Sequence, residues 1–197
     1  MAELVALDHL NGILSCIVVG ISFYVGIYIL LKYVQLKNKN HLYVSLVALI
    51  TSEPWWPHVI SYIMALSGGN GLEAIPYFML GSLFIPLAIA LWLLALSNLQ
   101  YKEHKKFLLF FSIVYLVAYE AIFLSALFTN ISIVGMRLGE IDVQYNFIML
   151  GLLMSALLII LPTGLNFARV SLNSLNKEIK MKGKFLAMAF ITFCVGA

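Results

Sequence analysis

The chain has 197 residues, of which 62% are hydrophobic and only 11% are charged, with a formal net charge of +3. An ordinary soluble domain carries about 25% charged residues, so most of this chain is predicted to lie in lipid. The basic residues form no cluster interleaved with aromatic side chains, which leaves nucleic-acid binding without support. Cys16 and Cys194 lie in apolar runs and form neither a metal-binding pattern nor a persuasive disulfide pair.

The amino terminus carries Glu3 and Asp8 but no lysine or arginine before the first apolar run. A cleaved signal peptide starts with basic residues and has a short apolar region. Here the apolar run is long enough to span a bilayer, and the positive charges follow it. We therefore expect an uncleaved membrane anchor whose start lies outside the cell.

Apolar stretches long enough to cross the bilayer recur along the chain, since about 20 helical residues cover the roughly 30 Å hydrocarbon core. Five predicted spans meet that length: 13–34, 42–66, 75–96, 107–128 and 146–168. A sixth, 185–197, is incomplete, so we expect the natural protein to continue, and one more helix would make seven. The predicted fold class is an all-α transmembrane helix bundle that forms a single domain over residues 1–197.

The loops between these spans differ in charge. Eleven of the 12 basic residues lie at the carboxyl-terminal end of the first span or after the first, third or fifth span, and only Arg137 lies in a loop of the other set. Random placement gives such a bias less than about one time in a hundred, and cytoplasmic loops are the ones enriched in lysine and arginine. The amino terminus is therefore predicted to lie outside a cell membrane. The outer set carries the acidic residues Glu3, Asp8, Glu73, Glu140 and Asp142.

Two segments outside the spans carry further patterns. Asn130 begins an N-glycosylation sequon on the predicted outer face, a three-residue pattern that also arises by chance. A helix-compatible basic stretch follows the fifth span, where it either binds anionic lipid headgroups or simply sets the topology. Its residues are Lys177, Lys180, Lys182 and Lys184.

Three ionisable side chains lie inside predicted spans: Glu53 and His58 in the second, and Glu120 in the fourth. A charge at the bilayer centre costs about 2.5–3.5 kcal/mol on insertion scales. At 1.5 Å per residue from the inner ends of their spans, the three residues lie about 16, 24 and 20 Å deep, respectively. We therefore expect them to share one layer, which is the strongest functional signal in the sequence.

The middle of the second predicted span reads Thr-Ser-Glu-Pro-Trp-Trp-Pro-His. Pro54 and Pro57 remove two amide donors and clash with the preceding turn. Ser52, followed by an acidic residue and a proline, resembles a helix N-terminus. Two structures stay open: a continuous helix kinked by proline, which we favour, and a discontinuous helix of the kind that forms binding sites in transporters.

Aromatic side chains surround these ionisable groups. Trp55 and Trp56 lie about ten residues short of the outer end of their span, where they either line an outward-facing cavity or pack between helices. A tyrosine beside Glu120 would satisfy a protonated carboxyl, and a neutral glutamic acid that only joins helices is the alternative. The predicted ligand or proton pocket comprises Glu53, Trp55, Trp56, His58, Tyr115, Tyr119 and Glu120.

Other features indicate helix packing and bending. Small residues recur every four positions in the first span, at Gly12, Cys16 and Gly20, a spacing that suits close helix contact. Prolines within the second and fifth spans indicate bends. The predicted hinge residues are Pro54, Pro57, Pro162 and Gly164.

Four short motifs carry a resemblance to a known group of proteins. They are Pro54-Trp55-Trp56-Pro57, Phe84-Ile85-Pro86-Leu87, Asp142-Val143-Gln144-Tyr145 and Lys182-Gly183-Lys184-Phe185-Leu186. With these motifs, spread over most of its length, the chain resembles a family of uncharacterised archaeal multi-pass, seven-helix membrane proteins. That family has no assigned activity, so the resemblance implies location and architecture only.

Several classes of function fit these features. We favour a sensor or receptor-like seven-helix module with an outward-facing pocket. The alternative is a proton- or ion-coupled transporter or channel that uses the intramembrane glutamates, although no internal repeat is visible. A retinal protein would need a lysine on the unseen seventh helix. An enzyme is the weakest choice because H-E-x-x-H, G-x-S-x-G and phosphate-binding glycine loops are absent, and no catalytic residue, metal or cofactor is predicted.

Overall fold

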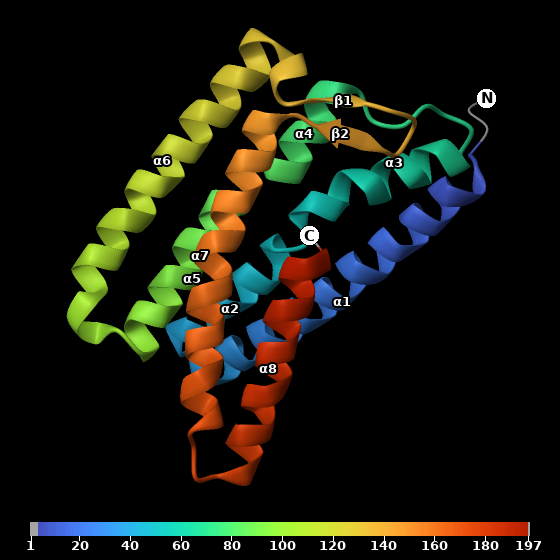
Figure 1. Ribbon diagram of the computed structural model, residues 1–197. Coiled ribbons are helices and arrows are strands. Elements are labelled where there is room, and N and C mark those ends of the chain that lie inside the picture. Colours follow the sequence, from blue (N-terminus) through green and yellow to red (C-terminus); the bar gives the residue numbers. More distant parts are fainter. Residues whose placement is uncertain (1–3, 197) are drawn as a thin grey trace. The chain divides into compact units, whose positions relative to one another are not determined.

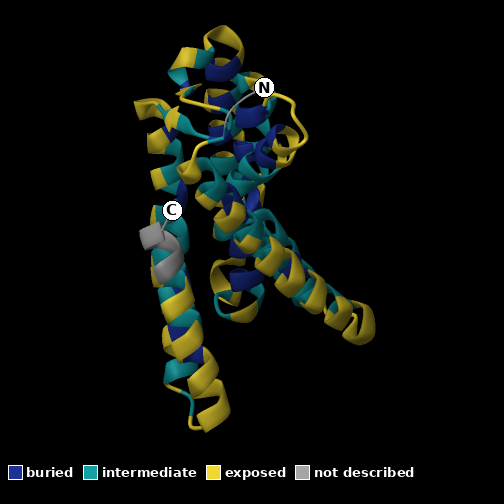
Figure 2. Cartoon of the chain, turned by 90° about the vertical axis from the view of Figure 1, so that its right-hand side faces the viewer, coloured by how far each residue is buried: buried dark blue, intermediate teal, exposed yellow. Residues whose placement is uncertain are grey.

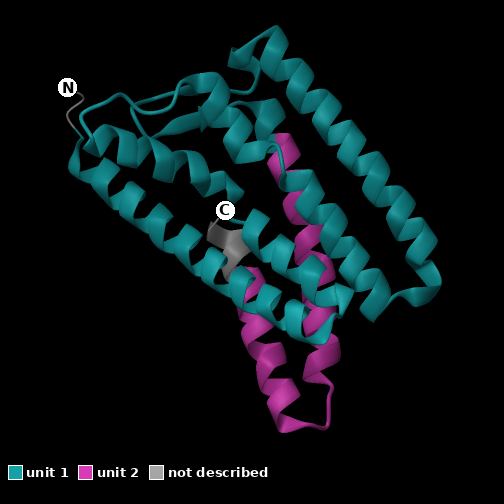
Figure 3. Ribbon diagram, turned by 180° about the vertical axis from the view of Figure 1, so that it is seen from behind, with its two compact units in different colours: residues 1–150 teal, residues 151–197 magenta. Residues whose placement is uncertain are grey.

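The computed structural model describes residues 4–196, with side chains described as far as residue 191. Glu3 and the side chain of Cys194 therefore lie outside the described residues. The structure is 81% helical, which confirms an all-α protein. It divides into two compact units, Met1–Leu150 and Gly151–Ala197, which we describe separately (Figure 3).

The elements follow one another in a simple order (Figure 1). The helices are α1 (Ala6–Leu36), α2 (Lys39–Ile50), α3 (Trp56–Leu66), α4 (Ala74–Ser82), α5 (Ile85–Leu99), α6 (Lys105–Thr129), α7 (Phe147–Leu172) and α8 (Lys177–Gly196). Short 3-10 turns η1 (Glu53–Trp55), η2 (Lys102–His104) and η3 (Ile131–Ile133) lie between them, and strands β1 (Gly135–Arg137) and β2 (Val143–Tyr145) form one hairpin.

Four helical segments of the described chain are long and apolar enough to cross a membrane, by length and composition. They are Ala6–Leu36, Ala74–Leu99, Lys102–Thr129 and Phe147–Leu172. These segments coincide with the first, third, fourth and fifth predicted spans and agree with a multi-pass membrane protein. The second predicted span is not among them, because five residues, 51–55, separate its two helices of 12 and 11 residues. In Ala74–Leu99 only two residues, 83 and 84, lie between the helical parts.

The favoured prediction of a continuous, kinked helix over 42–66 is wrong. Helix α2 ends at Ile50, and α3 begins at Trp56. Pro54 and Pro57 supply no amide hydrogen and break the ladder of hydrogen bonds. One carbonyl at the end of α2 is instead satisfied by a side chain, because the Ser52 hydroxyl donates to the Leu49 carbonyl at 2.9 Å.

The third predicted span is interrupted as well. Helix α4 ends at Ser82, and α5 begins at Ile85, with Leu83 and Phe84 between them. Pro86 lies in the first turn of α5, where its missing amide hydrogen costs nothing because that donor has no partner inside the helix. The first unit therefore contains two helix pairs, each with a break.

Helix α1 packs along both halves of the first broken pair. Gly12 faces the ring of Tyr62 on α3, and Gly26 faces Leu49 on α2, where an added Cβ would come within 2.6 Å of its side chain. Gly20 has open space around it. The small residues of α1 are thus contact points at its two ends, and the single long helix runs beside both short ones.

Helix α5 is the most enclosed element of the first unit, with nine residues buried, including Ile89, Trp92 and Leu96. In the other three candidate spans, 11–17% of the most apolar window is buried, against 50% for Ala74–Leu99. Many large apolar side chains of the long helices are exposed, and Figure 2 shows exposed residues along these helices. In a membrane these exposed faces meet lipid without cost.

The segment between α6 and α7 was predicted to be a loop, and it contains an antiparallel hairpin. Gly135 of β1 is opposite Tyr145 of β2, and Arg137 is opposite Val143. A side chain at Gly135 would collide with the carbonyl of Gln144, so this close register requires glycine at that position.

The two ends of the first unit are each held by polar side chains. At the basic end, which comprises residues 37–40 and 98–106, the Asn98 amide donates to Asn40 Oδ1 at 3.2 Å. At the hairpin end, which comprises residues 5–11, 67–73 and 130–146, the Asn11 amide donates to Asp142 Oδ1 at 3.1 Å. Along the first unit, the amino-terminal residues and the connecting segments thus lie in turn at the hairpin end and at the basic end (Figure 1).

In the second unit, α7 and α8 form a helical hairpin. Helix α7 continues through Pro162, and an added Cβ at Gly164 would come within 2.6 Å of the Phe190 ring on α8. A close helix contact thus accounts for Gly164, and its role as a hinge stays a prediction. Helix α8 starts at Lys177, eight residues earlier than the predicted sixth span, so the basic stretch is helical.

Candidate functional site

The two breaks in the first unit are joined by one carboxyl group. Glu53 lies in the turn between α2 and α3 and is fully buried. Its Oε1 accepts a hydrogen bond at 2.7 Å from the backbone N–H of Phe84, in the break between α4 and α5. The breaks also pack together, because a Cβ added at Gly81 would lie 3.1 Å from the Pro57 ring. Glu53 therefore has a structural role at this point.

A second carboxyl group lies near the first. Glu120, on α6, is half-buried, and the negative charge of its carboxylate interacts electrostatically with the carboxyl group of Glu53. The adjacent Tyr119 is 1% exposed, and both carboxyl charges act on its hydroxyl. Within the described residues, Glu53 Oε2, Glu120 Oε2 and the Tyr119 hydroxyl are buried and have no hydrogen-bond partner.

Tyr145, at the end of β2, belongs to the same group. Burial raises the pKa of its phenol to about 12, and the charge of Glu53 adds to that rise. We call Glu53, Tyr119, Glu120 and Tyr145 the carboxyl cluster. Sequence reasoning missed Tyr145 as a site residue, although its place directly before the fifth predicted span was a usable signal.

Buried polar groups without partners are uncommon because each costs about 1–3 kcal/mol. Two carboxylates close to one another add mutual repulsion, which favours a proton or a cation between them. The carboxyl cluster therefore combines two acceptor oxygens and a hydroxyl that the described protein atoms leave unsatisfied. Such a group is suited to bind a proton or a small cation.

His58 lies in a different network. The Tyr77 hydroxyl is 3.0 Å from Nδ1 and 3.2 Å from Nε2 of His58, and it donates to the Ile141 carbonyl at 2.9 Å. Asp142, which follows in the hairpin, is the carboxylate whose charge acts on His58. The expected single layer is thus divided, with the two glutamates in one group and the histidine bonded towards the hairpin. Sequence reasoning also missed Tyr77.

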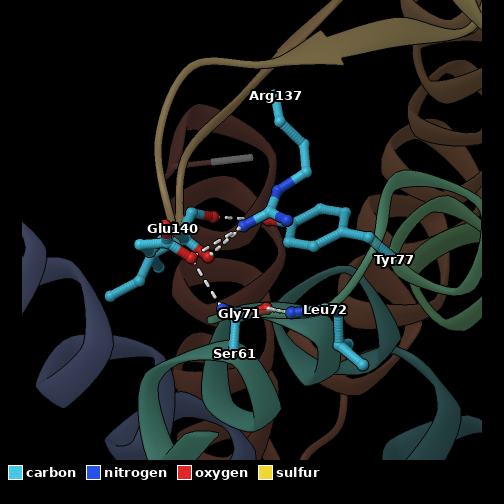
Figure 4. Close-up of polar contacts among 7 residues, drawn as sticks. Ser61, Gly71, Leu72, Tyr77, Arg137 and Glu140 are labelled. Carbon is cyan, nitrogen blue, oxygen red and sulfur yellow. Dashed lines mark hydrogen bonds and ion pairs between the residues drawn. The ribbon is translucent and has the colours of Figure 1, made fainter. Parts of the chain in front are cut away.

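The hairpin end is closed by a set of polar contacts that we call the hairpin clasp: Ser61, Gly71, Leu72, Arg137 and Glu140 (Figure 4). Arg137 donates to the Glu140 carbonyl at 2.7 Å, and Glu140 Oε2 accepts from the Gly71 amide at 2.6 Å. Leu72 N–H donates to the Ser61 hydroxyl at 3.1 Å. A side chain at Gly71 would collide with the Glu140 carbonyl, so the clasp depends on a bare backbone there.

The predicted aromatic residues serve packing and polar contacts that differ from one another. The Trp56 indole donates to the Ser52 hydroxyl at 3.0 Å. Its ring and that of Phe23 on α1 are arranged edge to face, with their centroids 6.1 Å apart. Trp55 is half-buried in the same turn. Tyr115 stacks in a row of rings along α6, with its centroid 6.0 Å from that of Tyr119. Helix packing thus accounts for Trp56, and the cavity prediction is not supported at that residue.

Among the described residues, no group of three or more histidine, cysteine or acidic side chains could hold a metal ion. No family model, curated protein or solved structure matches the chain. The resemblance to archaeal multi-pass proteins therefore stays a prediction, and the carboxyl cluster is the feature that bears on function.

Proposed function

We propose that this protein is a proton- or cation-coupled transporter or channel whose carboxyl cluster takes up the transported ion. The observation that carries the proposal is the pair of buried, unpartnered oxygens, Glu53 Oε2 and Glu120 Oε2, beside two helix breaks. Ionisable residues within spans are costly and commonly mark ion pathways. Discontinuous helices form the binding sites of many transporters.

The proposal includes a topology. The amino terminus lies outside the cell membrane, the broken pair α2–α3 makes the second of five complete crossings, and α8 begins a sixth. Two observations support this: the loops alternate between the basic end and the hairpin end, and eleven of 12 basic residues lie at the carboxyl-terminal end of the first span or after an odd-numbered span. The positive-inside rule places the basic end in the cytoplasm.

In this mechanism Glu53 is the fixed member of the pair, because Phe84 N–H holds one of its oxygens. Glu120 is half-buried, and it is the member that exchanges with the surroundings. A proton that binds either carboxyl removes the repulsion between them. Tyr119 and Tyr145 supply hydroxyls that accept or donate a hydrogen bond as the charge changes.

Proton flux in liposomes tests the proposal. The purified protein is reconstituted with a pH-sensitive dye, and an imposed potential drives proton entry. We expect Glu53→Gln and Glu120→Gln to lower the flux at least about tenfold, because an amide cannot release a proton at neutral pH. Glu73→Gln, an exposed site at the hairpin end, is the matched control and keeps the flux of the unmodified protein. Undiminished flux in both cluster variants overturns the proposal.

A sensor or receptor-like module is the second candidate, and one observation favours it. Tyr77 links His58 on α3 to the hairpin carbonyl of Ile141, so a ligand that moves the hairpin also moves the helix next to the break. In that case the unmodified protein shows no ion flux. A fluorophore at Leu138, an exposed hairpin residue, should then respond to the ligand and lose its response in Tyr77→Phe.

A further inference from the structure

The first two turns of α8 carry four lysines that differ in their surroundings. Lys182 donates to Glu178 at 2.6 Å, an exposed i, i+4 ion pair. Lys177, Lys180 and Lys184 are exposed and have no acidic partner within 4.0 Å among the described residues. The helix therefore bears one neutralised lysine and three uncompensated ones.

The three uncompensated lysines share one face of the helix. At about 100° per residue, positions 177, 180 and 184 fall within an arc of about 60°, and Lys182 lies well outside it. Gly183 lies about 90° from the middle of that arc, and it packs against Ser171 at the end of α7, where an added Cβ would be 2.9 Å from its side chain. The contact with α7 thus leaves the lysine face uncovered by the second unit.

We propose that Lys177, Lys180 and Lys184 form a binding face for anionic phospholipid headgroups. The three residues occupy about 10 Å of helix, and the apolar run that starts at Phe185 follows them directly. A helix that enters the bilayer at Phe185 holds these ammonium groups at headgroup level, where each lysine contributes about fivefold to anionic-lipid binding. Headgroup binding by this face requires membrane insertion and does not require ion transport.

Short-chain phosphatidylglycerol, titrated into the full chain in neutral detergent, tests the face, with thermal stabilisation as the measure of binding. Lys180→Gln should weaken binding about fivefold, and replacement of all three lysines by glutamine about 100-fold. Lys182→Gln is the matched control, since it also removes one charge and should change binding less than twofold. Replacement of the three lysines by arginine should keep it.

Three results would overturn the proposal. The first is equal stabilisation of the unmodified protein by phosphatidylcholine and by phosphatidylglycerol, which would show that charge plays no part. The second is equal weakening of binding by Lys180→Gln and Lys182→Gln, which would show that binding depends on net charge and not on which face of the helix carries the lysine. Inorganic phosphate at the same concentrations could give equal stabilisation, which would assign the lysines to a free anion. Proton flux is measured separately, so its presence or absence leaves these outcomes distinct.

Discussion

Replacement of Glu53 by leucine should destabilise the junction between the two broken helix pairs. The Phe84 N–H loses the acceptor that now lies 2.7 Å away, in a place where Glu53 is fully buried. An unsatisfied buried amide costs about 1–3 kcal/mol, and polar contacts between membrane helices fall at the low end of that range. We therefore expect a loss of about 1–2 kcal/mol.

Glu53→Gln is the matched variant, because its side-chain oxygen can still accept from Phe84. Its stability should stay within about 0.5 kcal/mol of the unmodified protein. The two substitutions thus separate the structural role of Glu53 from its proposed role as an ion-binding group.

Hydrogen exchange of the Phe84 amide in micelles, together with the denaturant midpoint, provides the measurement. A loss of 1.4 kcal/mol corresponds to about tenfold faster exchange if local opening exposes the amide. Equal exchange rates and equal midpoints in the leucine and glutamine variants would refute the claim that this hydrogen bond holds the two breaks together.

Further substitutions test other contacts. Gly12→Ala places a methyl group against a buried ring and should cost about 1–3 kcal/mol, whereas Gly20→Ala, with open space around it, should not lower the denaturant midpoint. Tyr77→Phe removes a hydroxyl that donates to the Ile141 carbonyl in the hairpin. The hairpin should lose about 1.4 kcal/mol of local stability, so that its backbone amide hydrogens exchange about tenfold faster. Lys182 holds the pKa of Glu178 below its ordinary value, first through a hydrogen bond and then through its charge. Lys182→Gln should raise that pKa back towards its ordinary value, which an NMR titration would measure. The ion pair contributes to stability above the ordinary pKa of Glu178, and this contribution is lost as the pH falls through the lowered pKa.

Local sequence signals were sufficient for the long helices and for the position of the first break. Pro54 and Pro57 are three residues apart, and two missing amide donors within one turn end a helix. The error was to favour a kink, which is the usual result of one proline. The break leaves Glu53 buried, and one of its oxygens, Oε1, accepts from a residue 31 positions away.

Tertiary contacts determine the second break, and they also determine that His58 does not join Glu53 and Glu120 in one layer. Pro86 alone did not locate the end of α4, because the Phe84 amide, which lies in the break, is stabilised by Glu53 from another helix pair. His58 has the depth along its helix that would let it join the glutamates, but its ring bonds to the Tyr77 hydroxyl instead. Depth along a helix is readable from sequence, whereas the direction in which a side chain points depends on its neighbours.

The hairpin was missed for a similar reason. Its strands have three residues each, too few for an alternating pattern to emerge. Its register depends on the close approach at Gly135, which is a property of the paired backbone. Tyr145 entered the carboxyl cluster through this pairing, so its part in the site was equally hidden.

The hairpin clasp also bears on the order in which contacts can form during synthesis. The Gly71 amide can donate only after Glu140, 69 residues later, has been made, and the Asn11 amide only after Asp142, 131 residues later. The hydrogen bond between Phe84 and Glu53 spans 31 positions, so both of its partners exist before α6 has been made. The contacts that close the hairpin end are therefore late ones, and a chain arrested before residue 140 would lack them.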